Sequence, residues 1–377
     1  MKRVLHIIES FDGQATENWL YQMMCYMQEQ KIDFDWTFFV TLGKAGKFDN
    51  LIRNVGGKII YSKFLLHKKI NFMKFLREKS ISGGFEIIHS HHDVMSAIYF
   101  IALLGTGVEK KIIHIHNTTL SIPTNNFLKK ALLREPMRQV CMYLADTLVG
   151  VSEDALYAFQ KYKKLSSKSN SVVHCGINTA LFHRHLPDKK QLIKSLKLPQ
   201  DSNILLFVGR MTNDKNPLFI IDILRYLDKL SPTICVVFAG VGPLESIVQE
   251  IAAQQSLDNR VRVLGWHDDI PALMQSCDML IWPGKEHIKE GLGLAVVEAQ
   301  AAGLSVLMSL NVPDEAILIP ELVDVLPLAA GASEWAAKII FKLRCPTRVR
   351  DIFLAKVEAS SFTISRSTAN ILALYDK

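Results

Sequence analysis

The chain has 377 residues and a mass of 42.5 kDa, and at about 100–200 residues per domain this length predicts two domains, or three. Hydrophobic residues make up 49% of the chain and charged residues 21%, which excludes disordered, collagen-like and low-complexity proteins. The six cysteines occur singly, without a C-x-x-C pair, so we expect a reducing, cytosolic compartment and no zinc ribbon. The longest uncharged apolar stretch, Val94–Val108, is too short for a membrane span.

The net charge of +7 is concentrated in the first half of the chain. Residues 1–180 carry a net charge of +8 and residues 181–377 one of −1, and one of the basic clusters comprises Lys129, Lys130, Arg134 and Arg138. Two interpretations stay open: solvated helix faces, or a face that meets anionic lipid or a lipid-linked phosphate. Nucleic acid is a less suitable partner, because aromatic residues are not interleaved with these charges.

Short apolar runs alternate with helical stretches along the whole chain. In chain order, the runs predict strands at Val4–Ile8, Asp35–Val40, Lys58–Tyr61, Ile87–His89, Lys111–His116, Thr147–Val151 and Ser171–His174, and then at Ile204–Gly209, Ile234–Ala239, Arg260–Leu264, Met279–Trp282, Ser305–Met308 and Val323–Pro327. We expect helices between them, for example at Glu17–Gln30, Pro217–Leu230 and Leu292–Ala302. The alternation predicts an α/β protein with two doubly wound parallel sheets, divided near Gly176–Lys190. Ligands bind beyond the carboxyl ends of parallel strands, so we expect the site in the cleft between the two domains.

The segment Pro283–Gly303 carries the strongest functional pattern. It follows an apolar strand, begins with a glycine-containing loop and continues into a helix, and the free N–H groups of such a helix start bind phosphate. Gly291 and Gly293 allow a ligand to approach the backbone closely. Glu290 precedes the helix and Glu298 follows roughly 12 Å further along it, which matches the two ends of a nucleotide sugar. Glu290 would accept from sugar hydroxyls and Glu298 from ribose hydroxyls, although a paired structural charge is an alternative for Glu298.

A second pattern is a buried strand that ends in a polar loop with Gly209, Arg210 and Lys215, followed by a helix with Pro217 near its start. Two cations five residues apart at a strand end can hold a diphosphate and neutralise the charge that develops as it departs. A surface loop with two solvated cations is the alternative, and the first pattern argues against it.

A third pattern, Gly240-Val241-Gly242, resembles the start of a dinucleotide fingerprint, but Glu245 stands at the third glycine position. We therefore expect Gly242 in a turn that contacts the nucleotide, and no nicotinamide site. Trp266 ends the next predicted strand and is a candidate for the base pocket. The neighbouring Asp268-Asp269 is interpreted as a helix cap rather than as a metal site.

In the first half, the loop Phe11–Glu17 again lies between a strand and a helix, where phosphate binds. His114 and His116 end another predicted strand on one face, and His116, nearest the strand end, is the better site candidate. His114 is more often a satisfied core or surface group. The group His89, His91 and His92 has a spacing suited to a metal, but we do not favour zinc there.

With these residues the chain resembles the retaining glycosyltransferase family 4, whose members have the GT-B fold. Glu290 and Glu298 match the family's paired glutamates, Arg210 and Lys215 its phosphate-binding pair, Gly13 its first-loop glycine and His116 its acceptor-side histidine. Residues 290–303 and Phe362–Ser365 resemble the bacterial capsule, exopolysaccharide and O-antigen branch. The first loop departs from the family's Gly-Gly-Ala-Glu, since it reads Gly13-Gln14-Ala15-Thr16.

The resemblance implies a metal-independent hexosyltransferase that uses a UDP- or GDP-linked sugar as substrate, retains the anomeric configuration and needs no cofactor. It implies an acceptor-binding domain at residues 1–180, a donor-binding domain at 181–355 and a helix at 356–377 that crosses back to the first domain. The implied catalytic residues are His116, Glu290, Arg210 and Lys215, and the implied donor-binding residues are Gly13, Gly209, Gly242, Trp266, Gly291, Leu292, Gly293, Leu294 and Glu298.

The acceptor implied by the resemblance is a polyprenyl-diphosphate-linked oligosaccharide of capsule, O-antigen or lipopolysaccharide synthesis. The enzyme would then be cytoplasmic and peripheral on the inner face of the cell membrane. Two other functions stay open: a non-hydrolysing nucleotide-sugar epimerase of the same fold, which needs no acceptor, and a non-catalytic subunit that binds a sugar nucleotide without turnover.

Overall fold

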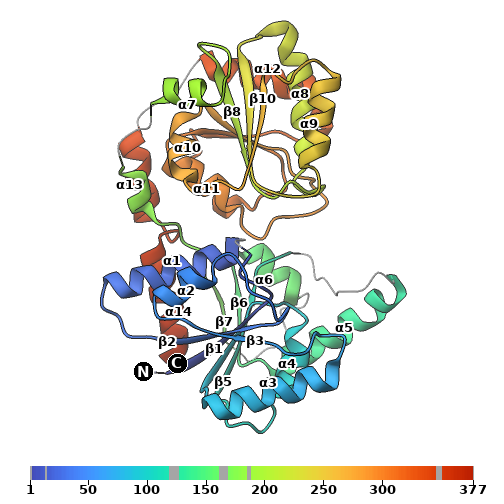
Figure 1. Ribbon diagram of the computed structural model, residues 1–377, viewed down its shortest axis with the longest axis vertical. Helices are drawn as coiled ribbons and strands as arrows, with labels where there is room; N and C mark the ends of the chain where they lie inside the picture. The colour runs from blue at the N-terminus through green and yellow to red at the C-terminus, as the bar shows by residue number, and fades with distance from the viewer. Residues whose placement is uncertain are drawn as a thin grey trace. The chain divides into compact units, whose positions relative to one another are not determined.

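The computed structural model describes residues 2–12, 15–118, 127–160, 169–184, 188–344 and 350–376. The chain divides into two compact units, one of residues 1–176 and 364–377 and one of residues 177–363 (Figure 1). The resemblance implies limits at 180 and 355, whereas the units divide after residues 176 and 363.

The first unit contains a parallel sheet in the strand order β3-β2-β1-β4-β5-β6-β7. Its strands are β1 (Arg3–Ile8), β2 (Asp35–Val40), β3 (Lys58–Tyr61), β4 (Ile87–Ser90), β5 (Lys110–Ile115), β6 (Thr147–Gly150) and β7 (Ser169–Val172). The strand order reverses between β1 and β4, and in sheets of this kind the crevice beside such a reversal binds ligands. The loops that follow β1 and β4 flank this point.

Helices cover both faces of the first sheet, and they are α1 (Ala15–Glu29), α2 (Asp49–Asn54), α3 (Lys69–Gly83), α4 (Ser96–Ala102), α5 (Phe127–Leu144), α6 (Glu153–Gln160) and α14 (Ile364–Asp376). On one face, Trp19 of α1 donates to Ser367 of α14 at 2.8 Å, so the last helix of the chain completes the first unit. On the other face, Phe72 of α3 packs against Phe39 of β2 with the ring centroids 5.7 Å apart.

The second unit contains a parallel sheet in the strand order β10-β9-β8-β11-β12-β13. Its strands are β8 (Asn203–Val208), β9 (Ile234–Ala239), β10 (Val261–Gly265), β11 (Met279–Trp282), β12 (Ser305–Met308) and β13 (Val323–Val325). Its helices are α7 (Lys189–Ser195), α8 (Pro217–Leu230), α9 (Glu245–Gln254), α10 (Ile270–Ser276), α11 (Leu294–Ala301), α12 (Gly331–Arg344) and α13 (Arg350–Ala359), with short 3-10 turns at Thr179–Phe182, Asp314–Ala316 and Leu328–Ala330. The order reverses between β8 and β11, the two strands that carry the strongest sequence patterns.

The core of the second unit explains why its strands were predictable. Strands β8 and β9 are almost entirely apolar and buried, as expected for parallel strands covered by helices on both faces. Phe207 of β8, Phe238 of β9 and Trp335 of α12 belong to one buried hydrophobic cluster. The side chains of α8 that pack into this cluster recur at helical spacing, so the helix predicted at Pro217–Leu230 is found at those residues.

The structure confirms the predicted α/β class with two doubly wound parallel sheets. Two element limits were wrong in ways that matter for the site. Strand β5 ends at Ile115, so His116 lies directly after the strand and not within it. Helix α11 begins at Leu294 and not at Leu292, because Gly293 adopts a left-handed conformation that precedes the helix. In the described part of the chain, no helix combines the length and the apolar character needed to cross a bilayer.

Candidate functional site

In the second unit, the loops after β8 and β11 meet at the point where the strand order reverses. Lys215, from the loop after β8, donates to the carboxylate of Glu290, from the loop after β11. Both side chains are largely buried, with 11% of Lys215 and 13% of Glu290 exposed. Asp214 lies 4.0 Å from the Lys215 ammonium and 3.9 Å from the Arg210 guanidinium. The structure therefore brings the predicted residues Arg210, Lys215 and Glu290 together.

Two residues that the sequence analysis did not select hold this pair in place. The Lys215 ammonium lies 5.3 Å from the ring centroid of Trp282, the last residue of β11, which is a cation–π arrangement. Asn311, three residues beyond β12, accepts from the Glu290 backbone N–H at 2.7 Å and donates to the Glu290 carboxylate at 3.4 Å. The only feature of the sequence that indicated Asn311 is its position as a polar residue just beyond a buried strand.

The start of helix α11 depends on one glycine. Gly293 has φ +82°, and a Cβ at this position would lie 2.7 Å from Cγ1 of Val312. Gly291 and Leu292 precede it and are buried, and Leu294 is the first helical residue and is half-buried. The first N–H groups of a helix lack partners within the helix, so the start of α11 suits a phosphate group. Glu290 lies close to this helix start in the sequence.

Glu298 lies one turn into α11 and is half-buried among apolar residues. Burial raises the pKa of its carboxyl from 4.5 to about 7. Among the residues that the structure describes, no side-chain hydrogen bond or ion pair to Glu298 is found, so the interpretation as a paired structural charge is not supported. A carboxyl with unused acceptors in such a place suits the hydroxyls of a ligand.

The glycines after β8 and β9 have a packing role. A Cβ on Gly240 would lie 1.9 Å from the carbonyl oxygen of Gly209, and one on Gly242 would lie 2.5 Å from the carbonyl oxygen of Met211. The loops after these two strands therefore pack backbone to backbone, whether or not they also contact a nucleotide. The Gly242 N–H donates to the carboxylate of Glu245 at 2.5 Å.

Two residues after β10 make local hydrogen bonds. Trp266 is partly exposed, and its indole N–H donates to Asp268 at 2.7 Å. Asp269 accepts from the Ala272 N–H at 3.1 Å, which confirms its role as the cap of α10.

In the first unit, the start of helix α1 brings Thr16 to His116. Their side chains meet at 3.3 Å between Thr16 Oγ1 and His116 Nδ1, across the ends of β1 and β5. Gly13, the predicted first-loop glycine, lies outside the described residues, as does Gln14. His116 is half-buried, and burial and the neighbouring His92 lower its pKa from 6.5 to about 3, so the ring is neutral.

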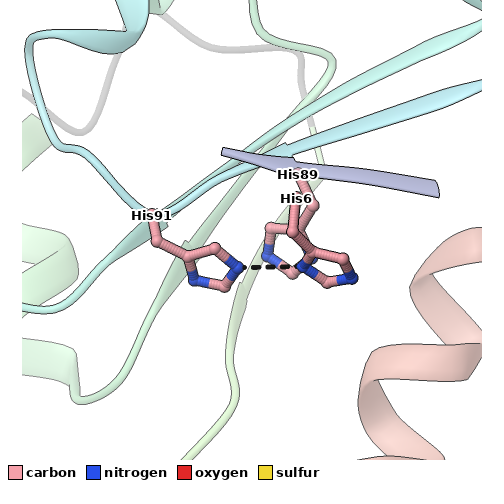
Figure 2. A group of neighbouring side chains, drawn as sticks. All are labelled: His6, His89 and His91. Carbon is pink, nitrogen blue, oxygen red and sulfur yellow. Dashed lines mark hydrogen bonds between the residues drawn. The ribbon is translucent and has the colours of Figure 1, made fainter. Parts of the chain in front are cut away.

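His116 belongs to a layer of five histidines on the face of the first sheet that α1 and α14 cover; the other members are His6, His89, His91 and His114. One ring nitrogen from each of His6, His89 and His91 lies within 4.8 Å of the others (Figure 2). The same holds for His91, His114 and His116. His92, which completed the metal-like spacing in the sequence, instead bonds to the Tyr99 hydroxyl at 2.6 Å. His114 is buried in this layer, as expected of a core residue.

The basic cluster on α5 is only partly a surface feature. Arg138 is buried and donates to the carbonyl oxygens of Phe159 and Gln160, so its inclusion in an exposed basic face was wrong. Arg134 is exposed, and next to it Leu133 and Leu132 are 42% and 72% exposed. Two exposed leucines therefore lie beside an exposed basic residue on α5.

The chain matches known protein families over most of its length. Residues 16–181 match the family described as Glycosyltransferase Family 4, and residues 188–321 match Glycosyl transferases group 1. The putative glycosyltransferase EpsF of Bacillus subtilis is 26% identical over 90% of this chain and 87% of its own length. The UDP-Gal:alpha-D-GlcNAc-diphosphoundecaprenol alpha-1,3-galactosyltransferase of Escherichia coli is 24% identical over 64% of this chain and 60% of its own length.

The fold is shared with a solved structure, Anabaena HepE in complex with UDP and glucose. It superimposes with a TM-score of 0.81 at 15% sequence identity, and the match covers 100% of both chains. The two doubly wound units are therefore those of the GT-B fold, and together with the two family matches they lead to one conclusion: the chain belongs to glycosyltransferase family 4.

Proposed function

We propose that this glycosyltransferase moves a hexose from a nucleotide-diphosphate donor to a hydroxyl of a lipid-linked oligosaccharide, with retention of the anomeric configuration. The observation that carries the proposal is the buried Lys215–Glu290 pair between the loops of β8 and β11. It joins a cation suited to phosphate to a carboxylate suited to sugar hydroxyls at the place where this fold binds ligands.

In the donor complex, Arg210, Lys215 and the N–H groups at the start of α11 hold the diphosphate. Glu290 accepts from hydroxyls of the sugar, Glu298 accepts from hydroxyls of the ribose, and Trp266 and Gly242 line the nucleotide site. UDP is the favoured nucleotide, because the E. coli relative is named for a UDP-linked donor and HepE was solved with UDP. The positions of these residues at adjacent strand ends support the assignment.

The reaction then needs one bond to break and one to form at the anomeric carbon. The acceptor oxygen attacks on the face from which the diphosphate leaves, the bond between the anomeric carbon and the phosphate oxygen breaks, and a phosphate oxygen takes the hydroxyl proton. Arg210 and Lys215 neutralise the departing charge, the task that a metal ion has in other transferases. We therefore expect the rate to be unchanged by EDTA.

The acceptor is a polyprenyl-diphosphate-linked sugar of surface-polysaccharide synthesis, presented at the inner face of the membrane. The name of the E. coli relative supports this acceptor class. Exposed Leu132 and Leu133 beside Arg134 support α5 as the element that contacts the bilayer. Sedimentation with anionic vesicles at low salt tests this contact: wild type should pellet and Leu132→Asp/Leu133→Asp should stay in the supernatant. Failure of the wild type to bind would contradict it.

The transfer itself is tested with UDP- and GDP-sugars and a synthetic lipid-linked acceptor, and the anomeric configuration of the product is read by NMR. Wild type should give a product with the configuration of the donor, whereas Lys215→Met should lose at least a hundredfold in rate. Lys338→Met is the matched control, because Lys338 also pairs with a carboxylate, Asp324, within the same unit. Inversion, or equal rates for both variants, would refute the proposal.

A further inference from the structure

The histidine layer contains a file of three hydrogen-bonded imidazoles that ends at His116. Nδ1 of His6 lies 3.1 Å from Nε2 of His91, and Nδ1 of His91 lies 3.0 Å from Nε2 of His116. Nδ1 of His116 then meets the Thr16 hydroxyl at 3.3 Å. Figure 2 shows the first of these bonds as a dashed line, with His89 beside His6. His6 and His91 are buried, whereas His116 is half-buried and forms the open end of the file.

The connectivity couples the protonation of the three rings. A neutral imidazole has one N–H and one lone pair, and each contact in the file joins Nδ1 of one ring to Nε2 of the next. Every contact needs one donor and one acceptor, so all three rings must have the same tautomer. The rings are neutral, because burial lowers the pKa of His6 and His116 to about 3 and that of His91 well below its ordinary value. The tautomer of His116 therefore depends on that of His6, to which His116 is connected through His91.

The surroundings of His6, at the buried end of the file, determine which tautomer the three rings have. In the described residues, Nε2 of His6 is buried without a hydrogen-bond partner, and the ring lies tilted against Trp36 and edge to face with Tyr375, with centroids 4.5 and 6.5 Å away. The negative faces of aromatic rings attract an N–H group and repel a lone pair. Nε2 of His6 therefore carries the hydrogen, and the same follows for His91 and His116.

A metal ion explains the cluster less well. Ligand lone pairs must converge on an ion, but Nδ1 of His6 and Nε2 of His91 are hydrogen-bonded to each other at 3.1 Å, and two nitrogens paired in this way do not both offer a lone pair. The pKa values of His89 and His91 are lowered by burial and by neighbouring imidazoles, and no carboxylate contributes to these shifts. A buried dication would lack the compensating charge that it needs.

We propose that His6 and His91 are positioning residues that lock His116 in its Nε2–H form, so that His116 presents a lone pair at Nδ1 to a substrate hydroxyl. This step rests on the proposed function, with His116 in the catalytic role that the family resemblance implies. The Thr16 hydroxyl occupies the place that the substrate hydroxyl takes and donates to the same nitrogen. His116 orients the hydroxyl but does not remove its proton, because the proton would have to stay on a buried file that is closed at His6.

The direct test is a two-dimensional NMR spectrum of the full chain with ¹⁵N-labelled histidine, which distinguishes protonated from unprotonated ring nitrogens. The His116, His91 and His6 signals are assigned by their loss in single His→Gln variants. Each should show a protonated Nε2 and an unprotonated Nδ1. An Nδ1–H form of His116 in the wild type would overturn the proposal. The spectrum needs no substrate, so a protein without transferase activity would refute the proposed function and leave the lock testable.

Two substitutions at His91 distinguish control of the His116 tautomer from a simple packing role. His91→Gln keeps an oxygen that can accept from His116 Nε2–H, so the His116 tautomer should persist and kcat/KM should fall by no more than about twofold. His91→Phe fills the space without an acceptor, so His116 should show mixed tautomers and kcat/KM should fall about tenfold. His92→Phe is the control, since His92 lies next in sequence but bonds to Tyr99 outside the file.

Three outcomes would contradict the proposal that His6 and His91 fix the tautomer of His116. One is a His116 tautomer that is unchanged in His91→Phe, and another is equal activity of His91→Phe and His91→Gln. The third is one equivalent of zinc in the purified wild type, detected by elemental analysis and lost in His91→Phe, because the cluster would then be a metal site. If His91→Phe does not fold, the spectra of the wild type and His91→Gln still decide the question.

Discussion

The ammonium of Lys215 and the carboxylate of Glu290 form an ion pair between two loops that are 75 residues apart in sequence. Because both groups are largely buried, each depends on the other for its charge to be compensated. The pair has a structural role in the free protein, and in the donor complex its two members are expected to turn to phosphate and sugar. These two roles predict different results for single and double variants.

Lys215→Met should lower both stability and transfer. The unpaired Glu290 carboxylate should reduce the free energy of unfolding by about 1–3 kcal/mol. In Lys215→Met/Glu290→Gln the uncompensated charge is gone, so the thermal midpoint should return toward wild type while transfer stays at least a hundredfold low. Thermal unfolding and initial rates on the same samples check this. Recovery of activity together with stability would show that the pair is only structural.

Glu298 should make donor binding depend on pH. Its pKa of about 7 means that the carboxyl gains a proton as the pH falls through neutrality, and the protonated form accepts hydroxyl donors less well. Donor affinity of the wild type should therefore fall from pH 8 to pH 6. In Glu298→Gln the affinity should be about tenfold lower at pH 8 and constant over this range.

The same variant makes a prediction about stability. The carboxyl has a higher pKa in the fold than its ordinary 4.5, so its charge destabilises the fold above about pH 7, and the destabilisation disappears as the pH falls below that value. Glu298→Gln should therefore raise the thermal midpoint at pH 8 and change it little at pH 5. A lower midpoint at pH 8 would contradict the assignment of an unpaired, half-buried carboxyl.

Gly293→Ala should distort the start of α11. The residue has φ +82°, where a side chain costs about 1–2 kcal/mol, and the new Cβ would clash with Val312. Adding Val312→Ala should remove the clash but not the backbone strain, so only part of the lost thermal midpoint should return. Full recovery in the double variant would show that the left-handed conformation is not required.

Tyr375→Phe should loosen the contact between α14 and the first sheet. The Tyr375 hydroxyl lies 2.7 Å from Nδ1 of buried His89, and its removal leaves that nitrogen without a partner. We expect a loss of about 1 kcal/mol in the free energy of unfolding, measured by hydrogen exchange of amides in β1 and β4. Tyr157→Phe, at an exposed hydroxyl on α6, should leave the exchange unchanged.

The sequence predicted the sheets well because their strands are buried on both faces and read as apolar runs. β9 and β11 have the limits that their sequences indicated. β7 begins two residues earlier than expected, since its sequence Ser-Asn-Ser-Val lacks such a run. The start of α11 was misplaced because only a backbone angle at Gly293 separates loop from helix.

The candidate site was predictable where charged residues follow strands, as Arg210, Lys215 and Glu290 do. The histidine file was not, although the alternation of His89 with His91 and of His114 with His116 placed each pair on one face. The contact between these two pairs and His6 depends on the register of β1, β4 and β5. In that register His6 pairs with His89 and Ser90 with Ile113. That register is set by packing of the whole sheet, which a local pattern does not contain.

The central claim is that the loops after β8 and β11 hold the diphosphate of the donor. Calorimetric titration of UDP and GDP into the wild type, Lys215→Met and the control Lys338→Met tests it most directly. We predict that the wild type and Lys338→Met bind one of the two nucleotides equally well and that Lys215→Met binds it at least tenfold more weakly. Equal affinity of Lys215→Met and wild type, with both folded, would contradict the account.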